Sequence, residues 1–251
     1  MEDPLGLASR LREAECYAFD LDDTLHSFRK ASAVAVTAVL RIVQGESDSV
    51  YPLEELEAAY KRILARGTAL AFVDGKTSHQ YREDRFQQLI QDYNINLPKG
   101  HMQVLLDQYE KTLTESLQLK AGVVDLFQTL KRYGYKIAII TEGPQDAQER
   151  TVEALGLTPY IDYLATTNKL GVAKTDGMFV KVLNHLELEP RDMIMIGDSW
   201  ERDIVPAAQA GIYCIHYAER EPECVGINGR SSIEAFETLR ILVETTHRCP
   251  V

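Results

Sequence analysis

The sequence predicts an α/β protein whose core is a doubly wound parallel sheet, with an α-helical domain inserted after the first strand. From residue 120 onward, short apolar runs alternate with amphipathic helical patterns, as in parallel strands joined by helices. Between residues 31 and 117, apolar residues recur at helical spacing throughout. A chain of 251 residues with 45% hydrophobic residues is large enough for one core domain and a smaller partner.

The expected elements follow from these patterns in chain order. The first strand ends where the apolar run 17–19 meets an acidic string. The inserted block then carries three apolar stripes at helical spacing, which begin near Leu53, Phe86 and Leu105. The later elements are expected at 123–133 (helix), 136–140 (strand), 145–155 (helix), 163–165 (strand), 177–185 (helix), 193–196 (strand), 203–209 (helix), 212–216 (strand) and 232–243 (helix).

Composition narrows the function classes. The formal net charge of −11 argues against binding to nucleic acids or anionic membranes, because both need clustered Lys and Arg. A phosphorylated small molecule remains compatible, since a pocket field is set by its nearest charges. The start of the chain lacks a cationic, apolar leader, and no apolar run reaches about eighteen residues. We therefore expect a soluble intracellular protein, in the cytoplasm or nucleus.

The four cysteines show no C-x-x-C spacing, and two of them fall in expected strands. Buried thiols therefore explain them better than a zinc site or a disulfide framework. The cysteines are Cys16, Cys214, Cys224 and Cys249.

The string Asp20-Leu-Asp22-Asp-Thr24 is the most informative feature of the chain. Alternation along a strand would send the carboxylates of Asp20 and Asp22 to the same face. Two carboxylates so close repel each other, which raises one pKa unless a cation lies between them. The arrangement predicts a shared proton or a bound metal ion, with Thr24 beside it as a candidate substrate contact.

Three further polar elements follow in order. Thr141 ends one apolar run, Lys174 lies in a turn before a predicted helix, and Asp198 and Asp203 follow another apolar run. Ligands bind at the carboxyl ends of strands in open parallel sheets. We expect these side chains to meet the acidic string there.

These four elements resemble the motifs of the haloacid dehalogenase superfamily: Asp-x-Asp-x-Thr, a Thr or Ser after the second strand, a Lys, and an acidic Gly-Asp end. The resemblance covers residues 17–217 and is strongest to the branch of pyrimidine 5′-nucleotidases and N-acylneuraminate-9-phosphatases. It implies a Rossmann-like core formed by residues 1–27 and 118–251 and a helical cap domain at 28–117. A cap of this kind closes over the site and excludes water.

The resemblance also implies a phosphatase mechanism. Asp20 would attack phosphorus and form an aspartyl-phosphate, while Asp22 would act as general acid and then as general base. Thr141 would donate its hydroxyl to a phosphoryl oxygen, and Lys174 would hold Asp20 and the transferring oxygens by its charge.

A Mg²⁺ cofactor is implied as well, because hard oxygen ligands suit this ion. The expected ligands are a carboxylate oxygen of Asp20, the backbone carbonyl of Asp22, and Asp198. Asp203 would act beside them by orienting metal-bound water or the lysine. The carboxylate of Asp22 disfavours dehalogenases and phosphonate-cleaving relatives, which lack this acid.

Selectivity is expected in the inserted helices and in the loop after Leu25. The chain departs from the common Thr-Asn-Gly string at Thr141-Glu142-Gly143, and Glu142 would select a cationic or hydroxyl-bearing substrate or simply face water. Each arginine on a helix is also a candidate solvated surface residue. Candidate contacts to a polar or anionic leaving group are His26, Arg29, Arg82 and Arg85, and Glu142 and Gly143 are further candidate substrate contacts.

The implied substrate is a small phosphorylated metabolite such as a nucleotide, a sugar phosphate or a prenyl phosphate, and the implied protein is a monomer or small homo-oligomer. Two alternatives stay open. One is a phosphomutase of the same fold, which would keep both carboxylates of the first motif. The other is a phosphorylation-controlled binding module without turnover, although such modules are about half as long and have no cap.

Overall fold

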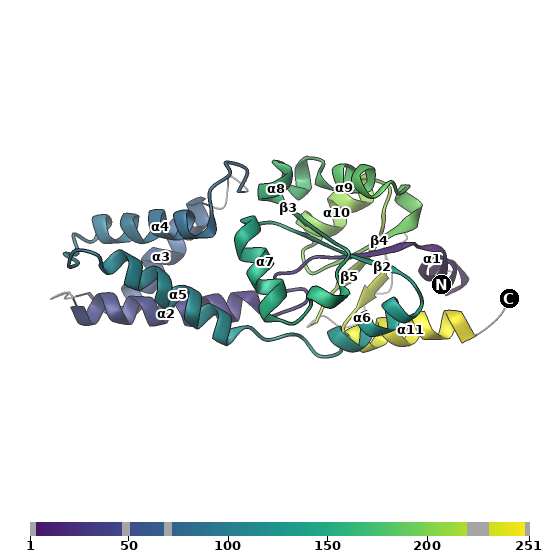
Figure 1. Ribbon diagram of the computed structural model, residues 1–251, viewed down its shortest axis with the longest axis horizontal. Coiled ribbons are helices and arrows are strands. Elements are labelled where there is room, and N and C mark those ends of the chain that lie inside the picture. The colour runs from purple at the N-terminus through teal and green to yellow at the C-terminus, as the bar shows by residue number, and fades with distance from the viewer. Residues whose placement is uncertain (1–3, 47–50, 68–71, 220–230, 249–251) are drawn as a thin grey trace.

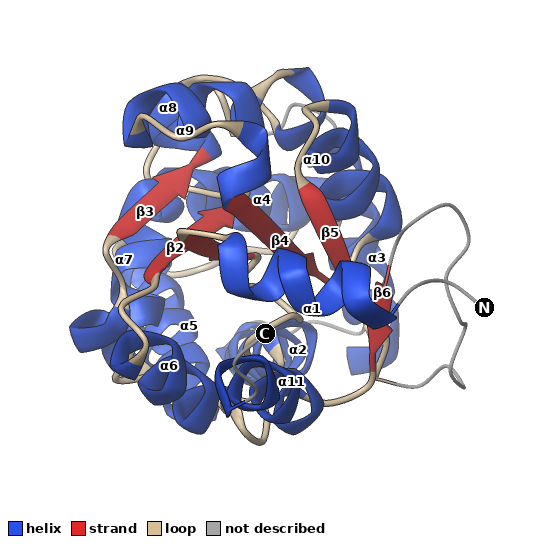
Figure 2. Cartoon of the chain, turned by 90° about the vertical axis from the view of Figure 1, so that its right-hand side faces the viewer, coloured by secondary structure: helices blue, strands red, loops and turns tan. Residues whose placement is uncertain are grey.

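The computed structural model describes residues 4–46, 51–67, 72–219 and 231–248. These residues form an all-parallel, six-stranded sheet in the order β3-β2-β1-β4-β5-β6, with helices on both faces (Figures 1 and 2). The expected doubly wound α/β core is confirmed. The strands are β1 (Cys16–Phe19), β2 (Lys136–Thr141), β3 (Tyr163–Thr166), β4 (Met193–Gly197), β5 (Tyr213–Tyr217) and β6 (Ser231–Ile233).

Helices cover the two faces of the sheet and form a separate group beside it (Figure 1). Those around the sheet are α1 (Pro4–Glu13), α6 (Val123–Arg132), α7 (Gln145–Ala154), α8 (Thr167–Leu170), α9 (Met178–Leu186), α10 (Val205–Gln209) and α11 (Phe236–Arg248). The separate group is α2 (Phe28–Glu46), α3 (Leu53–Gly67), α4 (Ser78–Asp92) and α5 (His101–Ser116), which we call the helical unit. None of the helices in the described ranges is long and apolar enough to cross a membrane.

The central strands bury both faces, which explains their continuous apolar runs. In β1, Tyr17 and Phe19 pack against the cluster that includes α6 and α11, whereas Cys16 and Ala18 pack against the cluster that includes α9 and α10. This two-residue period fixes the register of β1 between β2 and β4, because a slip by one residue would exchange the faces.

The helical unit has a hydrophobic core of its own. Its buried residues run from Ala31 to Leu113 and include none from the sheet. Helix α4 begins at Ser78 because Thr77 and Gln80 form a capping box. The two chain segments that join the unit to the sheet pair with each other, with Lys120 N–H donating to Leu25 O at 2.9 Å. The domain boundaries expected from the sequence stay a prediction.

Several elements differ from expectation. Residues 231–233 form the edge strand β6, and the last helix begins at Phe236 instead of 232. Two serines in this three-residue strand hid the apolar signal. Helix α10 begins at Val205 and follows a π-helical turn, Trp200–Ile204, where a helix from 203 was expected. The short helices α1 and α8 were not predicted.

Candidate active site

The site lies at the carboxyl edge of the sheet, where the strand order reverses. The chain runs from β1 outward to β2 and β3 and then returns to β4 on the other side of β1. Phe19 is in register with Ile139 and Ile196. Asp20, Thr141 and Asp198 therefore leave three adjacent strands at one crevice, which is the usual ligand position in such sheets.

Asp20 is held by a lysine and a threonine. Lys174 Nζ lies 2.5 Å from Asp20 Oδ1, and the Thr24 hydroxyl donates to Asp20 Oδ2 at 2.8 Å. The Asp20 residue is only 6% exposed. The carboxylate is thus fixed in orientation by one partner on each oxygen.

Lys174 connects Asp20 with Asp203. Its ammonium is 2.6 Å from Asp203 Oδ1, and the backbone N–H of Ser199 donates to Asp203 Oδ2 at 3.0 Å. Burial lowers the pKa of Lys174, but the two carboxylates outweigh burial and raise it above the ordinary value. Burial raises the pKa of Asp203 to about 7, with Lys174 opposing that rise and Asp20 adding to it. Two buried carboxylates thus share one ammonium.

The backbone of Gly197 and the side chain of Asp203 lie in close contact. The π-helical turn brings Asp203 back over Gly197, the last residue of β4. A Cβ at Gly197 would lie 2.4 Å from Asp203 Oδ2, so a glycine is required there. Single π-helical turns are frequently found at functional sites.

Three carboxylates form a cluster able to hold a cation. Oxygen atoms of Asp20, Asp198 and Asp203 lie within 4.8 Å of one another. Burial and the neighbouring charge of Asp20 raise the pKa of Asp198. A divalent cation would remove this repulsion, and the all-oxygen donor set fits magnesium.

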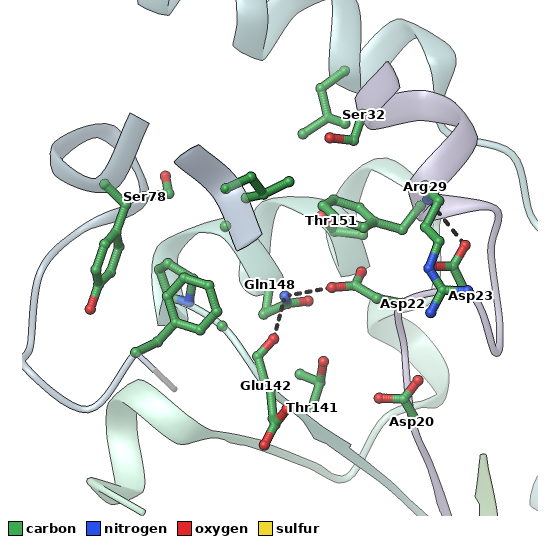
Figure 3. Close-up of a pocket in the computed structure, with 18 of the residues that line it drawn as sticks. Asp20, Asp22, Asp23, Arg29, Ser32, Ser78, Thr141, Glu142, Gln148 and Thr151 are labelled. Atoms are coloured by element: carbon green, nitrogen blue, oxygen red, sulfur yellow. Dashed lines mark hydrogen bonds and ion pairs between the residues drawn. The ribbon is translucent and has the colours of Figure 1, made fainter. Parts of the chain in front are cut away.

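The carboxylate of Asp22 lies outside that cluster. Oδ1 is 2.9 Å from His26 Nε2, and Oδ2 accepts a hydrogen bond from Gln148 Nε2 at 3.1 Å (Figure 3). The two carboxylates were predicted to share a face because side chains alternate along a strand. This reasoning was wrong, because β1 ends at Phe19 and neither Asp20 nor Asp22 lies in the strand. Both side chains nevertheless line one cavity, and the repulsion on Asp20 comes from Asp198 and Asp203 instead.

Thr141 presents a buried hydroxyl without a protein partner. Among the described residues, its Oγ1 has no hydrogen-bond partner although the residue is fully buried. The next turn places Gly143 at φ +143°, and a Cβ there would lie 2.7 Å from Gln148 Nε2. Buried hydroxyls normally find partners, so this one points to a ligand atom in the cavity.

Two residues predicted to contact substrate have protein partners in the structure. Thr24 is fully buried behind Asp20, accepts the backbone N–H of Asp198 at 3.0 Å, and is not among the side chains that line the cavity. Glu142 is partly buried and lines the cavity, and its carboxylate accepts the Lys174 backbone N–H at 3.2 Å and pairs with Arg202 at 3.3 Å. Its contact with substrate stays a prediction.

The cavity has a volume of about 400 Å³ and lies between the sheet edge and the helical unit. The three predicted arginines line it in different ways. Arg29 is largely exposed and pairs with Asp23, at 3.2 Å. Arg82 is buried, contrary to a solvated surface position, with its guanidinium 4.4 Å from the ring centroid of Tyr109. Arg85 is half-buried.

Gln148 and Arg202 were not predicted as site residues. Gln148 is buried on α7 and Arg202 lies in the π-helical turn. A polar residue on the inner face of the helix that follows Thr141 was the one available signal for Gln148. His26 was predicted to contact a leaving group, but it is fully buried and faces Asp22.

Comparisons with known proteins agree with this geometry. Residues 14–211 match the family model of haloacid dehalogenase-like hydrolases. Ribulose-1,5-bisphosphate 5-phosphatase of Halopiger xanaduensis is 26% identical over 211 residues, covering 83% of this chain and 86% of that protein. Pyrimidine 5′-nucleotidase PynA of Streptococcus pneumoniae is 25% identical over 201 residues, with 79% and 81% covered.

A solved structure shows the same fold. Magnesium-bound HAD-hydrolase YfnB of Bacillus subtilis superposes with a TM-score of 0.68 at 24% identity, covering 92% of this chain and 99% of that one. The family model spans more than half of the described chain and includes the β1, β2 and β4 termini that form the site. The protein is a member of the haloacid dehalogenase-like hydrolase family.

Proposed function

We propose that the protein is a magnesium-dependent phosphatase that hydrolyses a small phosphomonoester through an aspartyl-phosphate on Asp20. One observation carries this proposal: a buried carboxylate, fixed by Lys174 and Thr24, shares a cavity with the unpartnered hydroxyl of Thr141. This arrangement provides a nucleophile and a donor for a phosphoryl oxygen at one place.

In the first step, an oxygen of Asp20 attacks phosphorus in line, the bond to the leaving oxygen breaks, and the phosphoryl group is transferred to the carboxylate. Lys174 stabilises the developing negative charge, and Thr141 donates its hydroxyl to a phosphoryl oxygen. Asp203 acts through Lys174, because both of its oxygens already accept hydrogen bonds from the protein.

Asp22 is the acid and base of the proposed reaction. In protonated form it gives its proton to the leaving oxygen, and the resulting carboxylate then takes a proton from the water that opens the acyl phosphate. His26 and Gln148 position it by holding one oxygen each. The carboxylate can therefore serve both half-reactions without changing its rotamer.

Asp20 and Asp198 would hold the magnesium ion, together with the backbone carbonyl of Asp22. The ion would supply positive charge that lets an anionic nucleophile approach an anionic phosphate. The helical unit would cover the cavity as a cap, so that water reaches the intermediate only in a controlled way. Two of the relatives are named as a ribulose-1,5-bisphosphate 5-phosphatase and a pyrimidine 5′-nucleotidase. Their names support a small phosphorylated metabolite as the substrate of this protein.

The test is phosphate release from 4-nitrophenyl phosphate with and without magnesium, for the parent and Asp20→Asn. We expect magnesium-dependent turnover in the parent and a loss of at least about a thousandfold in the variant. Asp125→Asn, an exposed carboxylate on α6, is the matched control and should keep parental activity. Mass spectrometry after an acid quench should find the phosphoryl group on Asp20.

Three outcomes contradict the proposal. Turnover that survives Asp20→Asn removes Asp20 as nucleophile. Stable phosphorylation of Asp20 without release of phosphate indicates a binding module. Transfer of the phosphoryl group to an added sugar, in preference to water, indicates a mutase.

A further inference from the structure

Cationic side chains from both the core and the helical unit line the cavity, and they differ in whether a carboxylate lies beside them. Within the described ranges, four arginines and one lysine line it. Four of these five cations have a carboxylate within ion-pair distance: Arg29 with Asp23 at 3.2 Å, Arg82 with Glu110 at 3.5 Å, Arg202 with Glu142 at 3.3 Å and Lys174 with Asp20 at 2.5 Å. Arg85 has none among the described residues.

Aromatic rings surround Arg85 in place of carboxylates. Its guanidinium carbon is 5.9 Å from the ring centroids of Phe72 and Tyr81. Burial raises the pKa of the Tyr60 hydroxyl, and the charges of Arg85 and Arg82 together with a side-chain hydrogen bond from Arg85 oppose that rise. One N–H group of Arg85 is used by Tyr60. Contacts to ring faces leave the other N–H donors of the guanidinium available in the plane of the group.

Arg85 lies across the cavity from the reacting carboxylates. It belongs to α4 of the helical unit, whereas Asp20 and Asp22 follow β1 of the core, and all three line the same cavity. The wall contributed by the helical unit also includes Leu64 and Leu113. A leaving group placed here would have its ester oxygen near Asp22 and its far end against this wall, beside an arginine that has no carboxylate partner among the described residues.

We propose that Arg85 binds a second anionic group, a carboxylate or a phosphate, at the end of the leaving group remote from the ester. The inference rests on the proposed phosphatase function and names its substrate class: phosphomonoesters of compact leaving groups that carry a further negative charge. A guanidinium without a carboxylate partner in a partly enclosed cavity favours an anion, because its positive charge is not offset by a neighbouring acidic side chain. The guanidinium can hold either anion with two parallel hydrogen bonds.

The experiment compares aryl phosphates that share one scaffold. 4-Carboxyphenyl phosphate and 4-carbamoylphenyl phosphate have nearly the same shape and differ in charge at the remote end, and 1,4-phenylene bisphosphate presents a second phosphate there. We expect kcat/KM to favour the carboxylate over the amide by at least about tenfold, mainly through KM, as for a hydrogen-bonded charge pair. Comparing kcat/KM for 1,4-phenylene bisphosphate and 4-carboxyphenyl phosphate shows whether the site prefers a phosphate or a carboxylate.

Arg85→Gln should reduce the carboxylate-to-amide ratio of kcat/KM to near one, and Arg85→Lys should restore part of it. Arg41→Gln removes the same charge from an exposed position on α2 outside the cavity and should keep the parental ratio. Hydrolysis of the amide substrate by each variant shows that the protein is folded and active.

Equal kcat/KM for the carboxylate and the amide in the parent would overturn the inference and leave the phosphatase proposal standing. A preference that survives Arg85→Gln would assign the anion to another cation. If the parent hydrolyses none of the three esters, while stoichiometric phosphorylation or no reaction is found, the proposed function fails as well.

Discussion

Gln148 donates a hydrogen bond from its side-chain amide to the carboxylate of Asp22, at 3.1 Å, from a helix that also binds the helical unit. The same amide nitrogen is 3.4 Å from the backbone oxygen of Glu142. Asp146 and Arg150, one turn apart on α7, contact Ser78 at the start of α4. Helix α7 therefore contacts both Asp22 and the helical unit.

Gln148→Leu should slow hydrolysis of an alkyl phosphate by about tenfold more than hydrolysis of 4-nitrophenyl phosphate. A poor leaving group needs a correctly placed acid, whereas nitrophenolate leaves almost unaided. The measurement is the ratio of kcat for the two esters. Gln87→Leu, an exposed glutamine on α4, is the control and should not change the ratio. Equal slowing of both esters would mean that Gln148 does not act through Asp22.

Asp146→Ala should loosen the contact between α4 and α7. Asp146 accepts the backbone N–H of Ser78 at 3.0 Å, its hydroxyl at 2.6 Å, and Arg150 at 3.1 Å. We expect faster amide hydrogen exchange in the first turn of α4, measured by mass spectrometry, with parental exchange in the strands. Asp92→Ala, at the exposed end of α4, should leave exchange in that first turn unchanged.

The same contact should weaken in acid. Burial acts to raise the pKa of Asp146, but the hydrogen bonds from Ser78 and Arg150 outweigh burial and hold the pKa below its ordinary value. A depressed pKa contributes stability that is present above the unfolded value of about 4 and is lost as the pH falls through the folded pKa. The protection factor at the start of α4, which is exchange corrected for its intrinsic pH dependence, should therefore fall below about pH 4 in the parent, and the fall should be smaller in Asp146→Ala.

The sequence predicted the sheet well because its strands are buried on both faces and read as continuous apolar runs. It failed where the signal depends on tertiary contact. Strand β6 has two serines among its three residues and exists by pairing with β5. The burial of Arg82 against Tyr109 could not be inferred, because a lone arginine on a helix has the same sequence signal whether solvated or packed. Gln148 was not predicted for the same reason: its position beside Asp22 depends on its burial on α7, which a glutamine in a helical sequence does not indicate.

Lys174→Met should destabilise the metal-free protein by about 3–5 kcal/mol, because it leaves two buried carboxylates without their ammonium. Urea unfolding followed by circular dichroism measures this change. Lys181→Met, on the exposed side of α9, should stay within about 0.5 kcal/mol of the parent. Adding Asp203→Asn to Lys174→Met should recover part of the loss, since one of the two repelling charges is removed. Simple additivity of the two substitutions would contradict the coupling seen between these side chains.

Magnesium should stabilise the protein more at pH 8 than at pH 5. Burial raises the pKa of Asp203 to about 7, and burial together with Asp20 raises that of Asp198. An acid with a raised folded pKa contributes stability that is fully present below its unfolded value of about 4 and is lost as the pH rises through the folded pKa. Without magnesium, the cluster should therefore become less favourable between about pH 4 and pH 8.

Magnesium binding reverses this trend, because the cation interacts with the ionised carboxylates and competes with their protons. The measurement is the shift in Tm on adding millimolar magnesium at each pH. Asp198→Asn should remove most of the shift at pH 8, whereas Asp125→Asn should retain it. A shift that is equal at both pH values, or that survives Asp198→Asn, would place the ion outside the cluster of Asp20, Asp198 and Asp203.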